Sequence, residues 1–267
     1  MKKAYCSIGH LSKKEDIDNL ERILLYNYKV ISKFDYIVIH QNCSDSMKPY
    51  LSDYYNIWKK VFDKDVTAVP PLKNRGHTFG YMDSDNAVVN ACKSLPVEFI
   101  YKSVNDLLLD EKILDINITD EFDFYFLQGI GYTGLSPFNY DIDEYIRAYS
   151  TSQYLFPQTN FYIIKNMIDY IYNKKDIDAA FNHCQSISTF NGRVWEYIQD
   201  FSCEKFLADC VIRNNLKYKH LISDESFKRL LLLIKEYKIC DCSHKNIYID
   251  EIGVCHYHDP NSDCLIV

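Results

Sequence analysis

Four polar segments carry side chains that could bind an anionic ligand and a cation. They cover residues 9–12, 41–45, 74–80 and 102–106, and each closely follows a short apolar run. Lys and Arg pair with phosphate oxygens, while carboxylates bind divalent cations or accept hydrogen bonds from a ribose. Taken singly, each segment is also typical of an ordinary turn. Their shared position after apolar runs favours one composite site.

The elements that would position these segments alternate between strands and helices. Apolar runs predict strands over residues 4–8, 36–40, 66–69 and 97–101. Amphipathic segments between them predict helices, which implies right-handed crossovers and a mostly parallel sheet. Ligands of such sheets bind outside the carboxyl ends of the strands, where these polar segments would lie. We therefore predict an α/β fold with a mostly parallel sheet flanked by helices and a ligand site at one edge.

The composition excludes several classes of protein. Lys and Arg number 30 against 37 Asp and Glu, and the net charge of −7 argues against non-specific binding to nucleic acid or an anionic membrane surface. No apolar run approaches the roughly 20 residues of a membrane span, and the N-terminus lacks the apolar core of a signal peptide. The 10 cysteines are scattered along the chain. We expect a cytoplasmic protein with reduced thiols.

The third and fourth polar segments resemble the donor half of GT-A glycosyltransferases, the nucleotide-diphospho-sugar transferase superfamily. The residues that carry this resemblance are, in chain order, Asn74, Gly76, Asp83, Asp85, Asn86 and Asp106. The resemblance implies a single GT-A-like domain with a Rossmann-like nucleotide-binding half over residues 1–110. An acceptor half would follow over residues 111–238, and a C-terminal tail over residues 239–267 would fold across the site.

The acidic motif departs from the Asp-x-Asp pattern of the superfamily. Residues 103–106 are Ser, Val, Asn and Asp, so Asp106 is the only carboxylate. The resemblance implies that Asp106 binds Mn²⁺ or Mg²⁺, and one carboxylate suffices when phosphates and water complete the coordination. The metal would neutralise the nucleoside diphosphate as it leaves. The competing interpretation is that Asn105 and Asp106 cap a helix over residues 107–114.

The resemblance also implies a set of substrate-binding residues. Arg75 and Lys102 would pair with the diphosphate, whereas His10 and Asp45 would contact the base and ribose. The full predicted set is His10, Asp45, Asn74, Arg75, Gly76, Asp83, Asn86, Lys102, Ser103 and Asn105. A solvated side chain is the competing interpretation for Lys102, and a turn residue is the competing interpretation for His10 and Asp45.

The second half of the chain supplies a candidate catalytic residue. Residues 157–165 resemble a later strand of the superfamily, and residues 202–207 resemble its acidic acceptor-side helix. An inverting transferase needs a carboxylate to take the proton from the attacking hydroxyl, and Glu204 is the candidate. Asp200 and Asp209 are rivals, and a Glu in the first turn of a helix also stabilises the helix dipole without any catalytic role. The implied activity is a hexosyltransferase-like transfer, with inversion, from a UDP- or GDP-sugar to a glycan or other hydroxyl acceptor.

The C-terminal tail contains Cys and His residues of the types that bind metals. Zinc is one possibility, since Cys240, Cys242 and His244 precede Cys255, His256 and His258, although the one-residue gaps are unusual for zinc ligands. The resemblance implies a different role, in which His256 or His258 completes the metal site over the donor. Two other classes of protein stay open: a nucleotide-sugar-binding module without catalysis, and a zinc-stabilised interaction protein.

Overall fold

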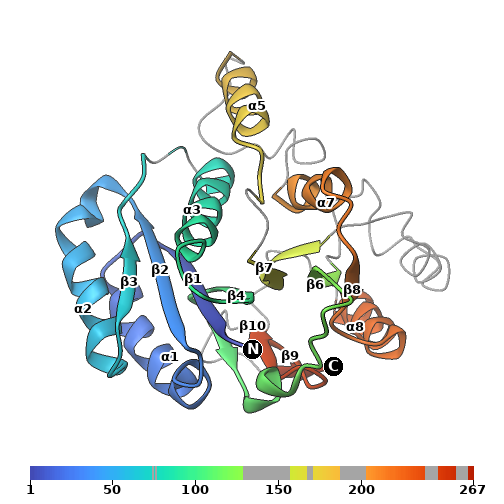
Figure 1. The fold of residues 1–267 in the computed structure, drawn as a ribbon. Coiled ribbons are helices and arrows are strands. Elements are labelled where there is room, and N and C mark those ends of the chain that lie inside the picture. Colours follow the sequence, from blue (N-terminus) through green and yellow to red (C-terminus); the bar gives the residue numbers. More distant parts are fainter. Residues whose placement is uncertain are drawn as a thin grey trace.

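Two β-sheets and six α-helices make up the described part of the chain (Figure 1). The structure is a computed structural model, and it describes residues 1–73, 75, 77–128, 157–166, 171–186, 203–237, 246–256 and 264–267. In these ranges no helix is long and apolar enough to cross a membrane.

The larger sheet has seven strands in the order β3-β2-β1-β4-β7-β6-β8. Its strands are β1 (Lys3–Leu11), β2 (Tyr36–Cys43), β3 (Val66–Val69), β4 (Phe99–Val104), β6 (Phe124–Gln128), β7 (Pro157–Lys165) and β8 (Tyr218–His220). The first four strands in the chain pair in parallel, and so do β6 and β8. Only β7 runs antiparallel to its two neighbours. The predicted α/β fold with a mostly parallel sheet is therefore confirmed.

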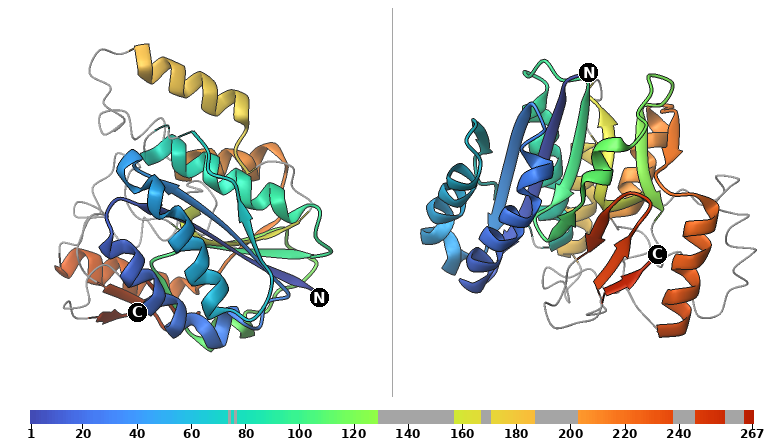
Figure 2. Two further views of the ribbon diagram at one scale, coloured as in Figure 1. Left: turned by 90° about the vertical axis from the view of Figure 1, so that its left-hand side faces the viewer. Right: turned by 90° about the horizontal axis from the view of Figure 1, so that it is seen from below.

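Helices cover both faces of the parallel part of this sheet (Figure 2). Helices α1 (Glu15–Ile31) and α2 (Leu51–Val61) pack together on one face, and α3 (His77–Cys92) lies against β1 and β2 on the other. This arrangement follows from the strand order, since the chain steps from β1 to β2 in one direction and from β3 to β4 in the opposite direction. The remaining elements are α5 (Lys174–Ser186), α7 (Cys203–Arg213), α8 (Asp224–Tyr237) and the 3₁₀ helices η1 (Asp45–Tyr50) and η2 (Glu111–Asp115).

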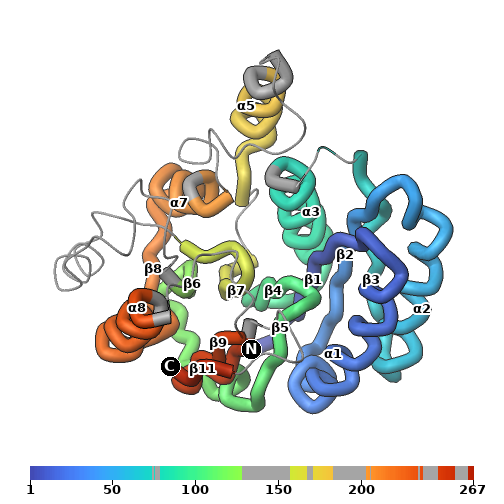
Figure 3. The backbone as a smooth tube through the Cα atoms, turned by 180° about the vertical axis from the view of Figure 1, so that it is seen from behind, coloured from blue at the N-terminus to red at the C-terminus, as the bar shows by residue number. Residues whose placement is uncertain are grey.

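The smaller sheet joins the C-terminal tail to the segment directly after β4 (Figure 3). Its four strands have the order β11-β9-β10-β5, with β5 (Leu107–Leu109), β9 (Asn246–Ile249), β10 (Val254–His256) and β11 (Cys264–Ile266). The buried side chain of Asn27 in α1 fixes β5 from the other side, because its amide donates to the Leu107 carbonyl at 2.8 Å and accepts from the Leu109 N–H at 2.8 Å.

The competing interpretation of Asn105 and Asp106, that they cap a helix over residues 107–114, is wrong. Leu107 to Leu109 form a strand that pairs with β10, and a 3₁₀ helix follows, capped by Asp110, which accepts from the Lys112 N–H at 3.0 Å. Long-range pairing with the tail therefore overrides the local helix signal. Asn105 and Asp106 occupy a turn between two strands, so they do not cap a helix.

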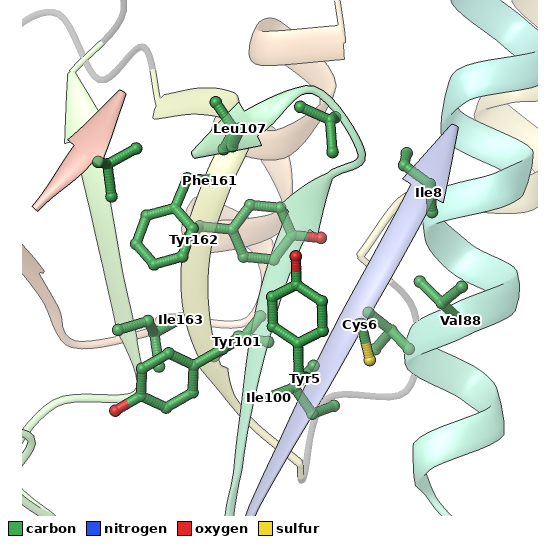
Figure 4. Close-up of a cluster of buried hydrophobic side chains, with 14 of the residues drawn as sticks. Tyr5, Cys6, Ile8, Val88, Ile100, Tyr101, Leu107, Phe161, Tyr162 and Ile163 are labelled. Carbon is green, nitrogen blue, oxygen red and sulfur yellow. The ribbon is translucent and has the colours of Figure 1, made fainter. Parts of the chain in front are cut away.

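The core follows the central strands β1, β4 and β7 (Figure 4). Tyr5, Tyr101 and Tyr162 come from these three strands and lie together in the close-up. All six residues of β4 are buried, as expected for a strand covered on both faces. This burial includes Lys102 and Ser103, which have no exposed surface.

Candidate functional site

The carboxyl ends of β1, β2 and β4 meet at the turn that contains Asn105 and Asp106. The Asn105 N–H donates to the Ile8 carbonyl at 3.0 Å, which places this turn beside the end of β1. Gly9 allows the close approach, since a Cβ atom there would lie 2.6 Å from Asn105 Cγ and 2.6 Å from Gln41 Oε1. The polar segments that follow β1, β2 and β4 thus converge at one edge, where open α/β sheets bind their ligands.

Two further predicted residues lie at this edge. His10 is exposed near the end of β1, and its strand register pairs it with Asn42. Asp45 begins η1 and forms an exposed ion pair of 2.7 Å with Lys48, which lowers the pKa of the Asp45 carboxyl. Both side chains are accessible to a ligand at the strand ends.

The tail borders the same turn. The backbone of His256 in β10 pairs with Leu107, the residue that follows Asp106. The His256 side chain and the whole of His258 lie outside the described residues. Within the described ranges there is no cluster of three or more His, Cys, Asp and Glu side chains that could hold a metal ion. A metal on Asp106 would therefore need further ligands from undescribed tail residues, from substrate phosphates or from water.

The zinc interpretation depends mainly on residues outside the described ranges. Cys240, Cys242 and His244 fall there, whereas Cys255 is described in β10. Its sulfur lies 3.8 Å from the Cys264 sulfur. Burial raises the pKa of the Cys255 thiol to about 12, with a smaller contribution from Cys264. Cys255 is therefore a protonated thiol at neutral pH when no metal is bound.

Arg75, Asp83 and Asn86, which were predicted to bind the substrate, instead contact other residues of the protein. Arg75 binds Asp83 through two nitrogens at 2.6 and 2.5 Å, and it binds Asp178 of α5 at 2.6 Å. The Asn86 side chain donates to the Tyr172 carbonyl at 2.8 Å and accepts from the Tyr172 N–H at 2.9 Å. These contacts connect α3 to residues 171–186. The predicted Asn74 and Gly76 lie outside the described residues.

Lys102 lies in the interior of the protein. Its Nζ donates to the Tyr81 hydroxyl and to the Thr159 carbonyl, and it lies 3.7 Å from Asp85 Oδ1, with both charged side chains 0% exposed. Burial lowers the pKa of Lys102 and raises that of Asp85, and the attraction between the two opposes both shifts. Lys102 is therefore shielded from a diphosphate at the strand ends. The neighbouring Ser103 hydroxyl donates to the Val104 carbonyl at 2.8 Å.

Glu204 lies in the first turn of α7, where its Oε1 accepts a hydrogen bond of 3.2 Å from the Thr159 hydroxyl. Helix α7 packs against β7 and α3, and Glu204 is partly buried there. The rival Asp209 is on the exposed face of α7, while Asp200 is outside the described residues. Of the described candidates, only Glu204 is linked through Thr159 to the Lys102–Asp85 pair.

The sequence did not predict that Tyr81 and Thr159 lie beside Lys102 and Glu204. Asp85 was one of the residues that carry the family resemblance, but no role was predicted for it. A helical spacing of four residues places Tyr81 and Asp85 on one face of α3, which is a signal that the sequence contains. Thr159 has no comparable signal, because its importance comes from contacts with three different elements.

Comparison with solved structures gives a distant structural likeness. No protein-family model matches the chain, and no curated protein sequence matches it. The chain is similar to the crystal structure of the glycosyltransferase GlyE of Streptococcus pneumoniae TIGR4, with a TM-score of 0.44 and 9% sequence identity. The match covers 98% of this chain and 55% of that one, so this chain spans about half the length of that protein.

Proposed function

We propose that the chain is a glycosyltransferase that moves a sugar from a UDP- or GDP-sugar to a glycan or other hydroxyl acceptor. The observation that carries this proposal is the Asn105–Asp106 turn at the carboxyl edge of parallel strands, bordered by tail strand β10. This edge is the ligand site of open α/β sheets, and the turn places an amide and a carboxylate there.

The residues at this edge suit a nucleoside diphosphate bound with a cation. Asp45 would accept hydrogen bonds from the ribose, and His10 would contact the base or ribose. Asp106, with His256 or His258 of the tail, would hold Mn²⁺ or Mg²⁺. Once bound, the metal would offset the negative charge that develops on the leaving diphosphate. The β10–β5 pairing supports this assignment because it brings the backbone of His256 next to the turn.

Glu204 would act as the general base. Its carboxylate would take the proton from the acceptor hydroxyl as that oxygen attacks the anomeric carbon, and direct displacement of this kind inverts the configuration. The hydrogen bond from Thr159 supports this role, because it orients one carboxylate oxygen of a partly buried side chain.

The test is calorimetry with UDP and GDP in Mn²⁺, in Mg²⁺ and in chelator, on the wild type and on Asp106→Asn. We expect nucleotide binding that the metal strengthens in the wild type and that Asp106→Asn makes insensitive to metal. Asp115→Asn is a matched control, since it removes one negative charge from an exposed position nearby in the chain. If neither UDP nor GDP binds at millimolar concentration, the proposal is contradicted. Binding without sugar transfer would favour the alternative of an inactive nucleotide-sugar-binding module.

A further inference from the structure

We propose that Thr159 is a positioning residue for Glu204, and that the buried Lys102–Asp85 pair holds Thr159 in place. This inference rests on the proposed function, in which Glu204 is the general base. Thr159 connects two parts of the molecule because its hydroxyl faces α7 and its carbonyl faces the Lys102 side chain.

Thr159 is 4% exposed, and it makes hydrogen bonds through its side chain and through its backbone carbonyl. Its hydroxyl donates to Glu204 Oε1 at 3.2 Å. Its carbonyl accepts from Tyr81 Oη at 2.7 Å and from Lys102 Nζ. The two donors on the carbonyl fix the backbone of Thr159, so the direction of its hydroxyl is also restricted.

The Lys102–Asp85 pair connects the hydrogen bonds of Thr159 to strand β4 and helix α3. Lys102 comes from β4, Asp85 from α3 and Thr159 from β7, so a single ammonium group contacts two neighbouring elements. Asp85 Oδ2 accepts from the Tyr172 hydroxyl at 3.0 Å, which ties a fourth segment to the same cluster. The cluster therefore fixes the relative positions of α3, β4 and β7 beneath Glu204.

A purely structural role explains this arrangement less well. A buried ion pair is a poor means of stabilising a core, because removing two charges from water costs more than packing apolar side chains of similar size. A general base, by contrast, must be held within hydrogen-bond reach of the proton it removes. The described contacts lead from the buried pair to Thr159 and then to Glu204.

The first test compares Thr159→Val with Thr159→Ser. Valine keeps the shape and the backbone carbonyl but removes the hydroxyl, whereas serine keeps the hydroxyl. We expect kcat to fall about tenfold in Thr159→Val with the donor KM unchanged, since a hydrogen bond to a charged group has about this effect. Thr159→Ser should restore kcat. Thr159→Ala removes the same hydroxyl and replaces the valine variant if melting shows that valine is not accommodated.

The second test does not need activity. In protein labelled with ¹³C-glutamate, the Glu204 carboxyl resonance is the one lost in Glu204→Gln. It should move in Thr159→Val and return to its wild-type position in Thr159→Ser. An unmoved resonance overturns the positioning role, and so does a moved resonance with kcat unchanged. Absence of sugar transfer by the wild type would instead refute the proposed function, and the resonance would still decide whether Thr159 orients Glu204.

Discussion

Replacing Lys102 and Asp85, first singly and then together, tests whether the buried pair is a coupled unit. Lys102→Met leaves a long unbranched side chain without its charge, and Asp85→Asn keeps the size and accepts the same hydrogen bond from Tyr172. Thr159 keeps one donor on its carbonyl in Lys102→Met, since the Tyr81 hydroxyl still binds there at 2.7 Å. Each single variant therefore isolates one buried charge without removing the rest of the network.

The expected size of the effect follows from the distance between the charges and from their burial. At 3.7 Å, with an effective dielectric constant of about 20, the attraction is about 4 kcal/mol. An orphaned group can instead become neutral. From the ordinary pKa of 10.5 for Lys102 and 3.8 for Asp85, neutralisation at pH 7 costs about 4 to 5 kcal/mol. We therefore expect each single variant to lose about 3 to 4 kcal/mol of unfolding free energy, or about 10 °C in melting temperature.

The double variant should lie within about 2 kcal/mol of the wild type, because no unpaired charge remains buried. The assay is urea unfolding of the wild type, both single variants and the double variant at pH 7. The exposed Lys48–Asp45 pair serves as the matched control. Its charges are closer, at 2.7 Å, yet Lys48→Met and Asp45→Asn should each leave the free energy of unfolding nearly unchanged, because water screens exposed pairs.

The pH dependence of the two single variants supplies the sharper criterion. In Asp85→Asn the orphaned Lys102 has a lowered pKa in the folded state, so this variant should regain stability as pH rises towards 10.5. In Lys102→Met the orphaned Asp85 has a raised pKa, so stability should return as pH falls towards 3.8. Slopes of the same sign, or a double variant that loses the sum of the two single effects, would refute the coupling.

Two further predictions concern the edge of the sheet. Burial lowers the pKa of His40 to about 4, against 6.5 when unfolded, so this residue should cost the native state up to about 3 kcal/mol as pH falls from 6.5 to 4. Urea unfolding of His40→Gln should show a smaller loss over that range, and equal losses would contradict the assignment. Gly9→Ala should cost about 1 to 3 kcal/mol and weaken nucleotide binding, because the new Cβ would displace Asn105 and Gln41. Melting and calorimetry measure both effects, and an unchanged affinity would show that the position of Asn105 does not matter for the nucleotide.

The parallel part of the fold could be predicted because each of its strands and helices is recognisable from its own short segment of the sequence. Each of the strands β1 to β4 is a short apolar or mostly apolar run, and the amphipathic helices α1 and α2 connect the first three. The interpretation of the segment after Asp106 as a capped helix, which was the alternative to a metal site, was wrong for the same reason. Asn105, Asp106 and the following leucines have the local pattern of a capped helix, but the pairing of Leu107–Leu109 with β10 depends on a segment near the other end of the chain.

The location of Lys102 shows where local reasoning about the site failed. The resemblance implied that Lys102 contacts the diphosphate, and the competing interpretation was a solvated side chain at the end of a strand. Residues 99–104 are however buried on both faces, so the position of the Lys102 side chain depends on α3 and β7, which pack around this strand.

The sequence still contains a usable signal for the Lys102–Asp85 pair. Lys102 lies within an apolar strand, and Asp85 lies on the buried face of α3, three residues after Met82 and three before Val88. Two opposite charges, each within an apolar pattern, are stable only when they pair with one another. This argument predicts a buried pair for these two residues. It leaves the exposed His10 and Asp45 and the half-buried Asn105 and Asp106 as the better candidates for contact with the ligand.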